Sequence, residues 1–589
     1  MTTMFSPLDP TEIAPGPTAP LSGADFDGVP AGYQCRHDGV WLMQASEEGD
    51  VIPKRLCSSL RVVALCRRHD RSGWARLLEV RDPDGDVHAV VLDAAELSGS
   101  ATRLLKPLIE RGLELERGPE VRKAVVALIQ SWRPTRRVTL VDTVGWGDES
   151  RADFALCDGA VIGTGSVILS AMARDRTGAV GREGTLDDWR CTVAMPCRGN
   201  PIALLALCQA FTGPLLMPLG MESGGFHLVG ASSSGKSTAQ RVAGSVWGGP
   251  DLLRSWRITD NALEATAAAS CDTLLLLEEL AKVDPAKLGD IVYMLGNGQG
   301  KRRVKSDGRN NSQLRWRVAI LSSGEVTIPA HIASGGRKVD AGHELRLVDV
   351  VADGGRYGAF DELHGVATPK EFAQSLVAAS RRCFGTAGPI FVEKLMAQPH
   401  AFDSAALLVR KFCEQAAQRH GQPPSAQADR VLKRFAIAAV AGELATRFGL
   451  TGWTTGEAWN ALLALAEECL LRKDTGTRSR TDEAVARTAT WIRGHAAEGL
   501  ARLTEGGAAG ADGWFDEAHY YLRPETWRRI HGGNARDAAR CHREADLLRS
   551  NEGSNQYRMP RIVPGQPRVY AVLRCHVDGS GGSRSASIH

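Results

Sequence analysis

The pattern of apolar and polar positions divides the chain into stretches of different character. From about Tyr33 to Asp187, short apolar runs such as RVVALCRR and VHAVVLD stand between turn signals, as strands do. Residues 200–365 alternate strand-like and helix-like segments, which is typical of an α/β domain. Residues 370–475 repeat apolar positions at helical spacing. The pattern therefore predicts an α+β domain, an α/β core and a helical segment, in that order.

The C-terminal part of the chain predicts helices followed by strands. RPETWRRIH and ARDAARCHREADLL have helical spacing, whereas YRMPRIV and RVYAVLR are strand-like segments separated by Pro564-Gly565. Helices followed by a two-stranded wing are typical of a winged helix-turn-helix. Near-helical spacing also relates four arginines, Arg536, Arg540, Arg543 and Arg549. Their spacing fits phosphate contacts, and it fits equally an exposed helix face that pairs with Asp537, Glu544 and Asp546.

A phosphate-binding loop follows the first strand of the α/β core. The strand Phe226–Val229 leads into GASSSGKST, which fits GxxxxGK[ST], and a helix follows. Backbone N–H groups of such a loop face phosphates, Lys236 reaches the β- and γ-phosphates, and Ser237 ligates Mg²⁺. A chance match in a Gly/Ser-rich turn is disfavoured by the flanking strand and helix. The residues expected to contact ATP are Gly230, Ala231, Ser232, Ser233, Ser234, Gly235, Lys236, Ser237 and Thr238.

Two acidic residues end the next buried strand. The run DTLLLLEEL from Asp272 to Leu280 holds four consecutive leucines, as a buried parallel strand does. At the end of such a strand in a phosphate-loop ATPase, the first acid holds Mg²⁺ and the second polarises the attacking water. We therefore expect Glu278 to hold the metal and Glu279 to be the general base. The alternative for two acids after an apolar run is an ordinary helix start.

Further candidates follow the third strand. The strand Trp316–Leu321 ends in Ser322 and Ser323, and a polar side chain at this place senses the γ-phosphate in oligomeric ATPases; a plain loop is the alternative. Arg346, in AGHELRLVDV, is a candidate arginine finger toward a neighbouring subunit, with Arg337 as second choice. The alternative for Arg346 is an ion pair with Glu344 or Asp349 of its own chain.

A basic segment lies between the acidic strand and the third strand. Turn signals at Asn297-Gly298 and Asp307-Gly308 predict a β-hairpin. In the central pore of a ring, such a hairpin would grip the phosphates of a single DNA strand. The alternative is a group of charged residues that is only exposed to solvent. The residues expected to bind DNA are Lys301, Arg302, Arg303 and Lys305.

Composition limits the broad class of protein. A chain of 589 residues is too long for one core, and its net charge of +3 neither demands nor excludes nucleic acid. None of the 13 cysteines has zinc-ligand spacing, so we expect reduced thiols and no zinc. No apolar run reaches the ~20 residues that span a bilayer, and the N-terminus lacks the basic patch and apolar core of a signal peptide. We therefore expect a soluble cytoplasmic protein without membrane contact.

The sequence resembles the Cch-type family, the cassette chromosome helicases of mobile elements, catalogued as a domain of unknown function (DUF927). The similarity runs from about Tyr33 to Arg472. The matching blocks stand in order along the chain: TVGW at Thr143–Trp146, GTLDDW at Gly184–Trp189, GFHLVGASSSGKST at Gly225–Thr238, SVWG at Ser245–Gly248, YMLGNGQGKRR at Tyr293–Arg303, LSSGE at Leu321–Glu325, AGHELR at Ala341–Arg346 and AGELATRFGLTGW at Ala441–Trp453.

The resemblance implies an α/β fold with an AAA+ core of the minichromosome-maintenance type, which forms a hexameric ring, uses ATP and Mg²⁺, and unwinds DNA. This chain keeps Lys236, Ser237 and Glu279, and it has Glu278 where relatives usually have Asp. We therefore expect an ATP-dependent DNA helicase or translocase of a mobile element or prophage. An ATP-gated DNA-binding initiator without processive unwinding and an ATP-driven remodeller of proteins are the alternatives.

Together these observations predict the following division of the chain. The parts are a disordered lead-in at 1–31, an N-terminal α+β domain at 32–199, an AAA+ phosphate-loop core at 200–369, a helical lid at 370–477, a winged-helix-like domain at 478–577 and a disordered tail at 578–589.

Overall fold

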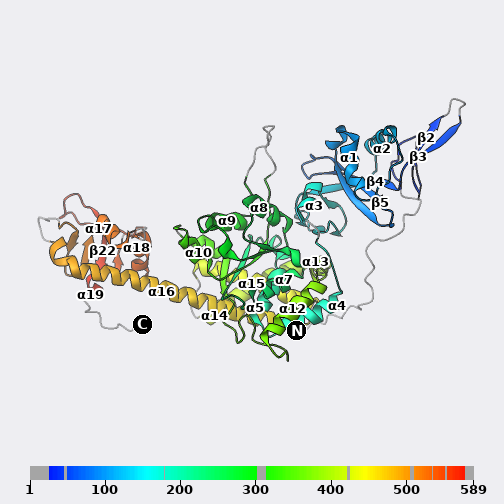
Figure 1. Cartoon of the computed structure of the whole chain (residues 1–589). Coiled ribbons are helices and arrows are strands. Elements are labelled where there is room, and N and C mark those ends of the chain that lie inside the picture. The colour runs from blue at the N-terminus through cyan, green and yellow to red at the C-terminus, as the bar shows by residue number, and fades with distance from the viewer. Residues whose placement is uncertain are drawn as a thin grey trace. The chain divides into compact units, whose positions relative to one another are not determined.

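The structure, a computed structural model, forms two compact units, Met1–Ala466 and Glu467–His589, which are described separately (Figure 1). The residues that it describes are 26–36, 38–45, 50–177, 180–301, 313–337, 339–420, 425–503, 510–532, 535–550 and 554–577. Arg302, Arg303 and Lys305 of the predicted DNA-binding hairpin lie outside the described residues, as do the predicted disordered tail and most of the lead-in. Within the described residues, no helix is long and apolar enough to cross a membrane.

The first unit begins with two sheets and two helices. Strands β1 (Tyr33–Arg36), β2 (Gly39–Ala45) and β3 (Val51–Cys57) form a three-stranded antiparallel sheet. A five-stranded sheet follows in the order β11-β7-β4-β5-β6, and its apolar side chains share a core with α1 (Ala101–Ile109) and α2 (Pro119–Ser131). Its strands are β4 (Leu60–Arg67), β5 (Ala75–Arg81), β6 (Val87–Asp93), β7 (Arg137–Val141) and β11 (Val167–Leu169).

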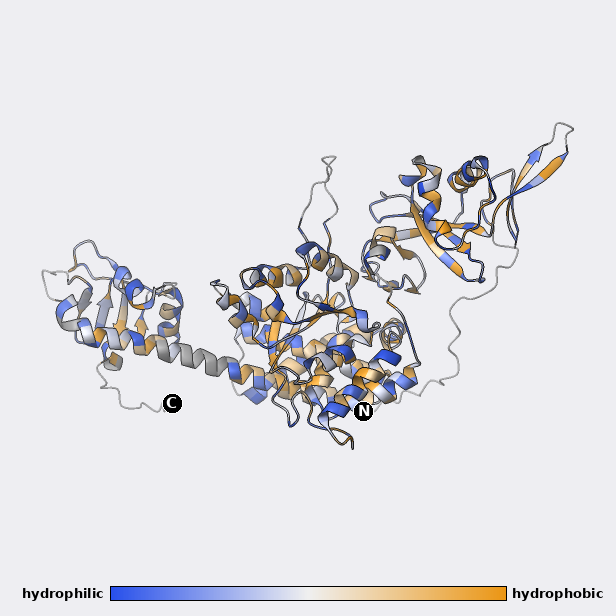
Figure 2. Ribbon diagram, in the orientation of Figure 1, coloured by the Kyte–Doolittle hydropathy of each residue, from blue (hydrophilic) through white to orange (hydrophobic). Residues whose placement is uncertain are grey.

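A five-stranded sheet, parallel throughout, forms the centre of the first unit, in the order β13-β14-β15-β12-β16. In Figure 2 the hydrophobic colour dominates these central strands, whereas the surrounding helices carry both colours. Burial on both faces explains the near-continuous apolar runs that the sequence shows here. The strands are β12 (Gly224–Val229), β13 (Leu253–Ser255), β14 (Leu274–Glu278), β15 (Ala319–Gly324) and β16 (Leu347–Val351).

Helices cover both faces of this sheet. Successive strand residues point to opposite faces. A Cβ added at Gly244 of α7 (Lys236–Gly244) would lie 2.9 Å from Leu276, so α7 packs on the Leu276 face. Leu275 and Leu277 point the other way and join the apolar side chains of α8 (Asp260–Ala269), α9 (Pro285–Asn297) and α10 (Ile328–Ser334).

The helical segment packs directly on the central sheet. Its helices are α12 (Pro369–Arg382), α13 (Ala387–Met396), α14 (Ala401–His420) and α15 (Ala426–Arg447). Phe435 of α15 lies 4.7 Å from Phe226 of β12, measured between ring centroids. The guanidinium of Arg434 donates to the carbonyl oxygens of Glu222 and Ser223 at 2.5 and 2.8 Å. The packing places α15 in the core of the first unit.

Residues 184–199, which the sequence places in the N-terminal domain, pack instead with the central sheet and its helices. The indole of Trp189 is buried and donates to the Ser245 hydroxyl at 2.8 Å, just after α7. The indole of Trp453 donates to the carbonyl of Ala194 at 2.8 Å. The packing boundary therefore lies before Gly184, ahead of the expected residue 199.

A buried ion pair joins the N-terminal strands to the central sheet. Asp272, fully buried just before β14, accepts from Arg317 at 2.9 and 3.0 Å and from the backbone N–H of Trp146 at 3.1 Å. Gly145 has φ +99°, and a Cβ there would lie 2.4 Å from the Asp272 carboxylate. The Trp146 indole donates to the carbonyl of Pro214 at 2.9 Å. The TVGW block therefore packs the N-terminal strands against the central sheet.

The second unit combines a long helix with a sheet and two short helices. α16 spans Glu457–Gly499, so the predicted boundary at 477/478 falls inside a helix. The sheet has the order β17-β18-β19-β22-β20, with β21 on β22. α17 (Pro524–His531) and α18 (Ala535–Glu544) lie beside β22 in Figure 1. The strands are β17 (Leu500–Arg502), β18 (Gly513–Phe515), β19 (His519–Leu522), β20 (Leu548–Arg549), β21 (Tyr557–Arg558) and β22 (Arg568–Leu573).

Gln240 of α7 ties that helix to the two strands beside it. Its side chain is fully buried, and its amide nitrogen donates to the carbonyls of Leu277 and Leu321 at 3.0 and 3.1 Å. Its amide oxygen accepts from the Ser323 hydroxyl at 2.7 Å. The pairing of β14 with β15 ends at Leu277 and Ser322. Gln240 therefore satisfies backbone groups at the place where the two strands separate.

Replacing Gln240 by Leu should loosen this end of the sheet. The change leaves two buried carbonyls and one hydroxyl without their partner, and each such loss costs about 1–3 kcal/mol. We expect hydrogen exchange in peptides covering β14 and β15 to accelerate at least tenfold, which corresponds to about 1.4 kcal/mol. Gln418→Leu, at an exposed position of α14, is the control and should leave these peptides unchanged. Equal protection in the two variants would contradict the structural role.

Candidate nucleotide-binding site

The loop from β12 ends in the first turn of α7, which presents backbone N–H donors to its surroundings. Gly235, the N-cap of α7, has φ +102°, which favours glycine, and no side chain caps the helix there. The first N–H groups of an α-helix have no partner inside the helix, and the helix dipole adds partial positive charge. Ser233 also has a left-handed backbone, with φ +62°. The donor set therefore fits a phosphate group.

Lys236 is held against the loop by its ammonium group. Nζ donates to the carbonyls of Gly230 and Ala231 at 2.8 and 2.6 Å and to the Ser234 hydroxyl at 3.2 Å. Burial lowers the pKa of Lys236 below its usual value, while the charges of Glu325 and Asp353 oppose that shift. Glu325 stands two residues after Ser323, at the edge of the sheet where the phosphate loop lies.

A second loop, residues 353–360, packs on the phosphate loop. The carboxylate of Asp353 accepts from the backbone N–H of Ala231 at 2.7 Å. The N–H of Ala359 donates to the carbonyl of Ser234 at 2.7 Å, and a Cβ on Gly358 would lie 2.6 Å from that same oxygen. Sequence reasoning did not identify this loop. Its only signal is the glycine-rich stretch DGGRYGAF, which is typical of close backbone approach.

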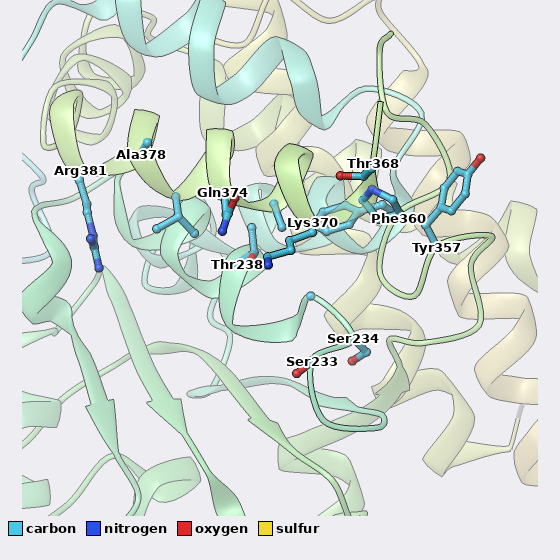
Figure 3. A pocket seen from close by; sticks show the side chains of 14 residues that line it. Ser233, Ser234, Thr238, Tyr357, Phe360, Thr368, Lys370, Gln374, Ala378 and Arg381 are labelled. Atoms are coloured by element: carbon cyan, nitrogen blue, oxygen red, sulfur yellow. The ribbon is translucent and has the colours of Figure 1, made fainter. Parts of the chain in front are cut away.

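A cavity of about 810 Å³ opens between the phosphate loop and α12 (Figure 3). Tyr357 and Phe360 lie at one end of it in Figure 3, and Arg381 lies at the other. Lys370 extends from α12 toward Thr238, the residue that ends the phosphate loop. The volume is within the range of small-molecule sites, about 300–1,000 Å³. The other lining residues are Ser233, Ser234, Gly235, Thr368, Pro369, Ala373, Gln374, Val377 and Ala378.

The two predicted carboxylates stand at the end of β14. Glu278 is its last residue and is half-buried. Glu279 follows with φ +63°, an uncommon backbone for a residue other than glycine, and such residues cluster at functional sites. The Glu279 carboxylate forms an ion pair with Lys282 at 2.5 Å, across a short 3₁₀ turn at Leu280–Lys282.

Ser322 points into the sheet instead of toward the phosphate loop. It is fully buried; its hydroxyl accepts from the Trp256 indole at 2.8 Å and lies 2.8 Å from His227 Nδ1. His227 Nε2 lies 3.0 Å from the carbonyl of Val326, which only accepts, so Nε2 carries the proton and Nδ1 accepts from Ser322. The Ser322 hydroxyl thus already donates one hydrogen bond and accepts another, so we do not assign phosphate sensing to it. The alternative, Ser323, is bound to Gln240.

Arg346 is the last residue of α11 (Ala341–Arg346) and lies against α9. Its guanidinium stacks over the ring of Tyr293, 4.3 Å from the centroid, and donates to the Asn297 side chain at 2.8 Å. Gly296 leaves the space for it, because a Cβ there would lie 2.3 Å from the arginine Cδ. These contacts hold the guanidinium of Arg346 against α9. Arg337, the second choice, is exposed.

The base of the predicted hairpin is two-stranded. Gln299 and Arg315 form an antiparallel bridge, and the N–H of Gly300 donates to the carbonyl of Leu314 at 2.9 Å. Lys301, the first of the predicted DNA contacts, forms an ion pair with Asp260 of α8 at 2.7 Å. The base leaves the C-terminal end of α9, where Gly298 has φ +68°.

Comparisons with known proteins agree with this architecture. Residues 33–315 match the family model described as "Domain of unknown function (DUF927)". The solved structure of SCCmec type IV Cch, described as an active helicase, matches with a TM-score of 0.65 at 16% identity, over 93% of this chain and 99% of that one. The chain therefore has a mixed α/β fold that resembles the Cch fold. No curated protein sequence matches it.

Two solved structures of NtrX from Brucella abortus also match, with a TM-score of 0.17 each, too low for any argument. One covers 56% of this chain and 65% of that one at 16% identity. The other, in complex with ATP, covers 76% of this chain and 91% of that one at 13% identity.

His227 should make the central sheet sensitive to acid. Burial lowers the pKa of His227 from 6.5 to about 4. Above pH 6.5 the imidazole is neutral in both the folded and the unfolded chain, so it has no effect on stability. As the pH falls from 6.5 toward 4, only the unfolded chain binds the proton. The shift amounts to about 3 kcal/mol in full, so the sheet loses stability over this window.

The measurement is hydrogen exchange of peptides covering β12 and β15 at pH 7.5 and pH 5.0, corrected for intrinsic rates. Protection should fall at the lower pH in the natural protein. His227→Gln keeps a polar side chain and removes the titrating group, so its protection should fall less. The same fall in both proteins would contradict the assignment.

Proposed function

We propose that this chain, which belongs to the DUF927 family, is an ATP-dependent DNA helicase or translocase with an AAA+ core. The observation that carries the proposal is the uncapped N-terminus of α7, with Lys236 beside it, at the sheet edge where Glu278 and Glu279 end β14. The Cch fold, whose solved example is described as an active helicase, and the two-stranded base after α9 support the DNA part of the proposal.

In this proposal ATP lies across the phosphate loop and the cavity beside it. The loop N–H groups and Lys236 bind the phosphates, and Thr238 leads to the cavity. Tyr357 and Phe360 offer aromatic rings for the base, whereas Lys370 and Arg381 bring positive charge from α12. Ser237 and Glu278 would hold Mg²⁺, which supplies charge neutralisation to the β- and γ-phosphates when bound.

Glu279 is the proposed general base. Its carboxylate takes a proton from a water molecule while the water oxygen bonds to the γ-phosphorus and the bond from that phosphorus to the β–γ bridging oxygen breaks. The ion pair with Lys282 must open for this, because the carboxylate oxygen that binds the ammonium cannot also take the proton. Lys282 therefore orients the base before the reaction.

The proposed motor is a ring in which Arg346 serves the nucleotide of the neighbouring subunit. Its pore would surround a single DNA strand, with Lys301, Arg302, Arg303 and Lys305 as the proposed DNA contacts. A hexamer and a role in a mobile element or prophage follow from the resemblance to Cch. Two alternatives are an initiator that binds DNA without processive unwinding and a remodeller of proteins. The DNA dependence of ATP hydrolysis distinguishes both from the proposed motor.

Glu279→Gln should slow ATP hydrolysis while leaving nucleotide binding nearly intact. Loss of a general base costs about 10²–10⁴-fold in rate. The amide keeps the size of the side chain, and the phosphate loop is untouched. The measurement pairs the steady-state ATPase rate with the Kd of a fluorescent ATP analogue. A variant that hydrolyses ATP at the natural rate would remove Glu279 from the role.

Single-stranded DNA should stimulate the ATPase activity. The Lys236→Ala protein is the blank, because it lacks the ammonium that binds the phosphates. Stimulation should disappear in a protein with Lys301, Arg302, Arg303 and Lys305 all changed to Ala, since DNA then loses its contacts in the pore.

Each outcome of that experiment decides between the proposals. Stimulation that is lost in the hairpin variant supports a translocating ring, and strand displacement is the next assay. Equal rates with and without DNA contradict the motor and favour a remodeller of proteins. Tight DNA binding with a slow, unstimulated rate favours the initiator. A rate no higher than the Lys236→Ala blank indicates an ATP-binding switch.

A further inference from the structure

The second unit carries a basic surface that the nucleotide chemistry does not use. Residues 510–577 contain eleven arginines and no lysine, against eight acidic residues. Five of those arginines and only one acidic residue, Glu552, fall between Arg549 and Val577. The positive charge therefore concentrates in the last part of this sequence range. We propose that this unit binds double-stranded DNA, with α18 in the major groove and the β21–β22 wing on the adjacent backbone.

α18 has an arginine face and an apolar face. Arg536, Arg540 and Arg543 are exposed and stand four and three residues apart, so they share one side of the helix. They span about 10 Å along its axis, at 1.5 Å per residue, which suits a major groove about 12 Å wide. Four buried residues hold α18 in the core of the unit, namely Ala538, Ala539, Cys541 and His542.

The acidic residues of α18 leave most of this charge available. Arg540 lies 3.6 Å from Asp537 and 3.8 Å from Glu544. Pairs this exposed and this long contribute little to stability, so phosphates can compete with them for the arginine. Arg536 and Arg543 form no ion pair within the described residues.

The wing places like charges opposite each other. Arg558 of β21 and Arg568 of β22 are direct partners in an antiparallel pair, and both are exposed. Arg561, in the turn between the strands, is exposed as well. Like charges directly opposite destabilise a strand pair. A row of phosphates relieves that repulsion, and the planar guanidinium binds two phosphate oxygens at once.

The wing and α18 meet at the same end of the unit. β20 follows α18 after three residues and pairs with β22, the strand that also carries β21. Arg549 of β20 stacks over the Tyr557 ring of β21, 4.6 Å from its centroid. Arg549 therefore bridges the helix and the wing.

The absence of open aromatic faces favours a duplex over a single strand. Proteins bind single strands by stacking bases on aromatic side chains. In the described part of the second unit, no Phe, Tyr or Trp side chain is exposed, and Trp514, Tyr521 and Trp527 are buried. The exposed ring of His495 stacks on Trp491, with 4.6 Å between ring centroids. Arg574 covers Phe515, 5.5 Å from its centroid. A surface of arginines without stacking platforms matches the backbone of double-stranded DNA.

The test measures DNA binding by the full chain without ATP, so it does not depend on the proposed ATPase activity. The background is the protein with Lys301, Arg302, Arg303 and Lys305 changed to Ala, which removes the proposed pore contacts. The probes are a labelled duplex of about 20 base pairs, two helical turns, and a single strand and a hairpin RNA of matched length. Fluorescence anisotropy gives Kd at several salt concentrations.

Two triple variants remove the proposed contacts, R536Q/R540Q/R543Q on α18 and R558Q/R561Q/R568Q on the wing. The matched control, R410Q/K411Q/R430Q, removes the same charge from exposed positions of α14 and α15. Each test variant should weaken duplex binding about tenfold and reduce the slope of log K against log salt by about 2–3, one unit per lost phosphate contact. The control should change neither.

Other results overturn the proposal. Unchanged duplex binding in both test variants does so, and an equal loss in the control would show an effect of net charge alone. Stronger binding of the RNA hairpin, lost in the same variants, would reassign the surface to RNA. Unchanged melting temperatures and ATPase rates show that the variants fold. Duplex binding that is lost while the ATPase activity remains separates this surface from the nucleotide site.

Discussion

The separation of β14 from β15 is the constraint on which the nucleotide site depends. Two neighbouring parallel strands that part at Leu277 and Ser322 leave backbone carbonyls that need donors. Gln240 supplies them, and it stands four residues after Lys236 on α7, on the same side of the helix. At 1.5 Å per residue, Lys236 lies about 6 Å from Gln240 along the helix axis, on the side of the phosphate loop. The buried amide of Gln240 thus ties the helix that carries Lys236 to the strand that ends in Glu278.

Hydrogen bonds from buried tryptophan indoles also join the chain segments around this site. Trp189 donates to Ser245, Trp146 to the carbonyl of Pro214, and Trp247 to the carbonyl of Ala210. Each bond joins segments far apart in the sequence while the ring fills the core. These residues belong to the GTLDDW, TVGW and SVWG blocks that carry the resemblance to the Cch-type family. Those blocks therefore reflect packing around the phosphate loop more than contact with nucleotide.

Local patterns predicted the elements of the site, whereas the partners of its side chains depend on distant segments. The order of strand, loop and helix around Gly230–Thr238 is a local property, so the sequence was sufficient to find it. The contacts of Ser322 could not be predicted, because its partners, His227 and Trp256, lie 95 and 66 residues away in the sequence. Asp353 was missed for the same reason, since nothing near it in the sequence points to Ala231. The order of strands in the sheet is likewise non-local.

α9 connects the proposed chemistry to the proposed DNA contacts. It begins just after the turn in which Lys282 holds Glu279, and it ends at Gly298, where the two-stranded base starts. Arg346 lies against its side through Tyr293 and Asn297. A helix of 13 residues is about 20 Å long. In the proposed motor, α9 therefore links the turn that holds Glu279 to the base of the hairpin and to Arg346.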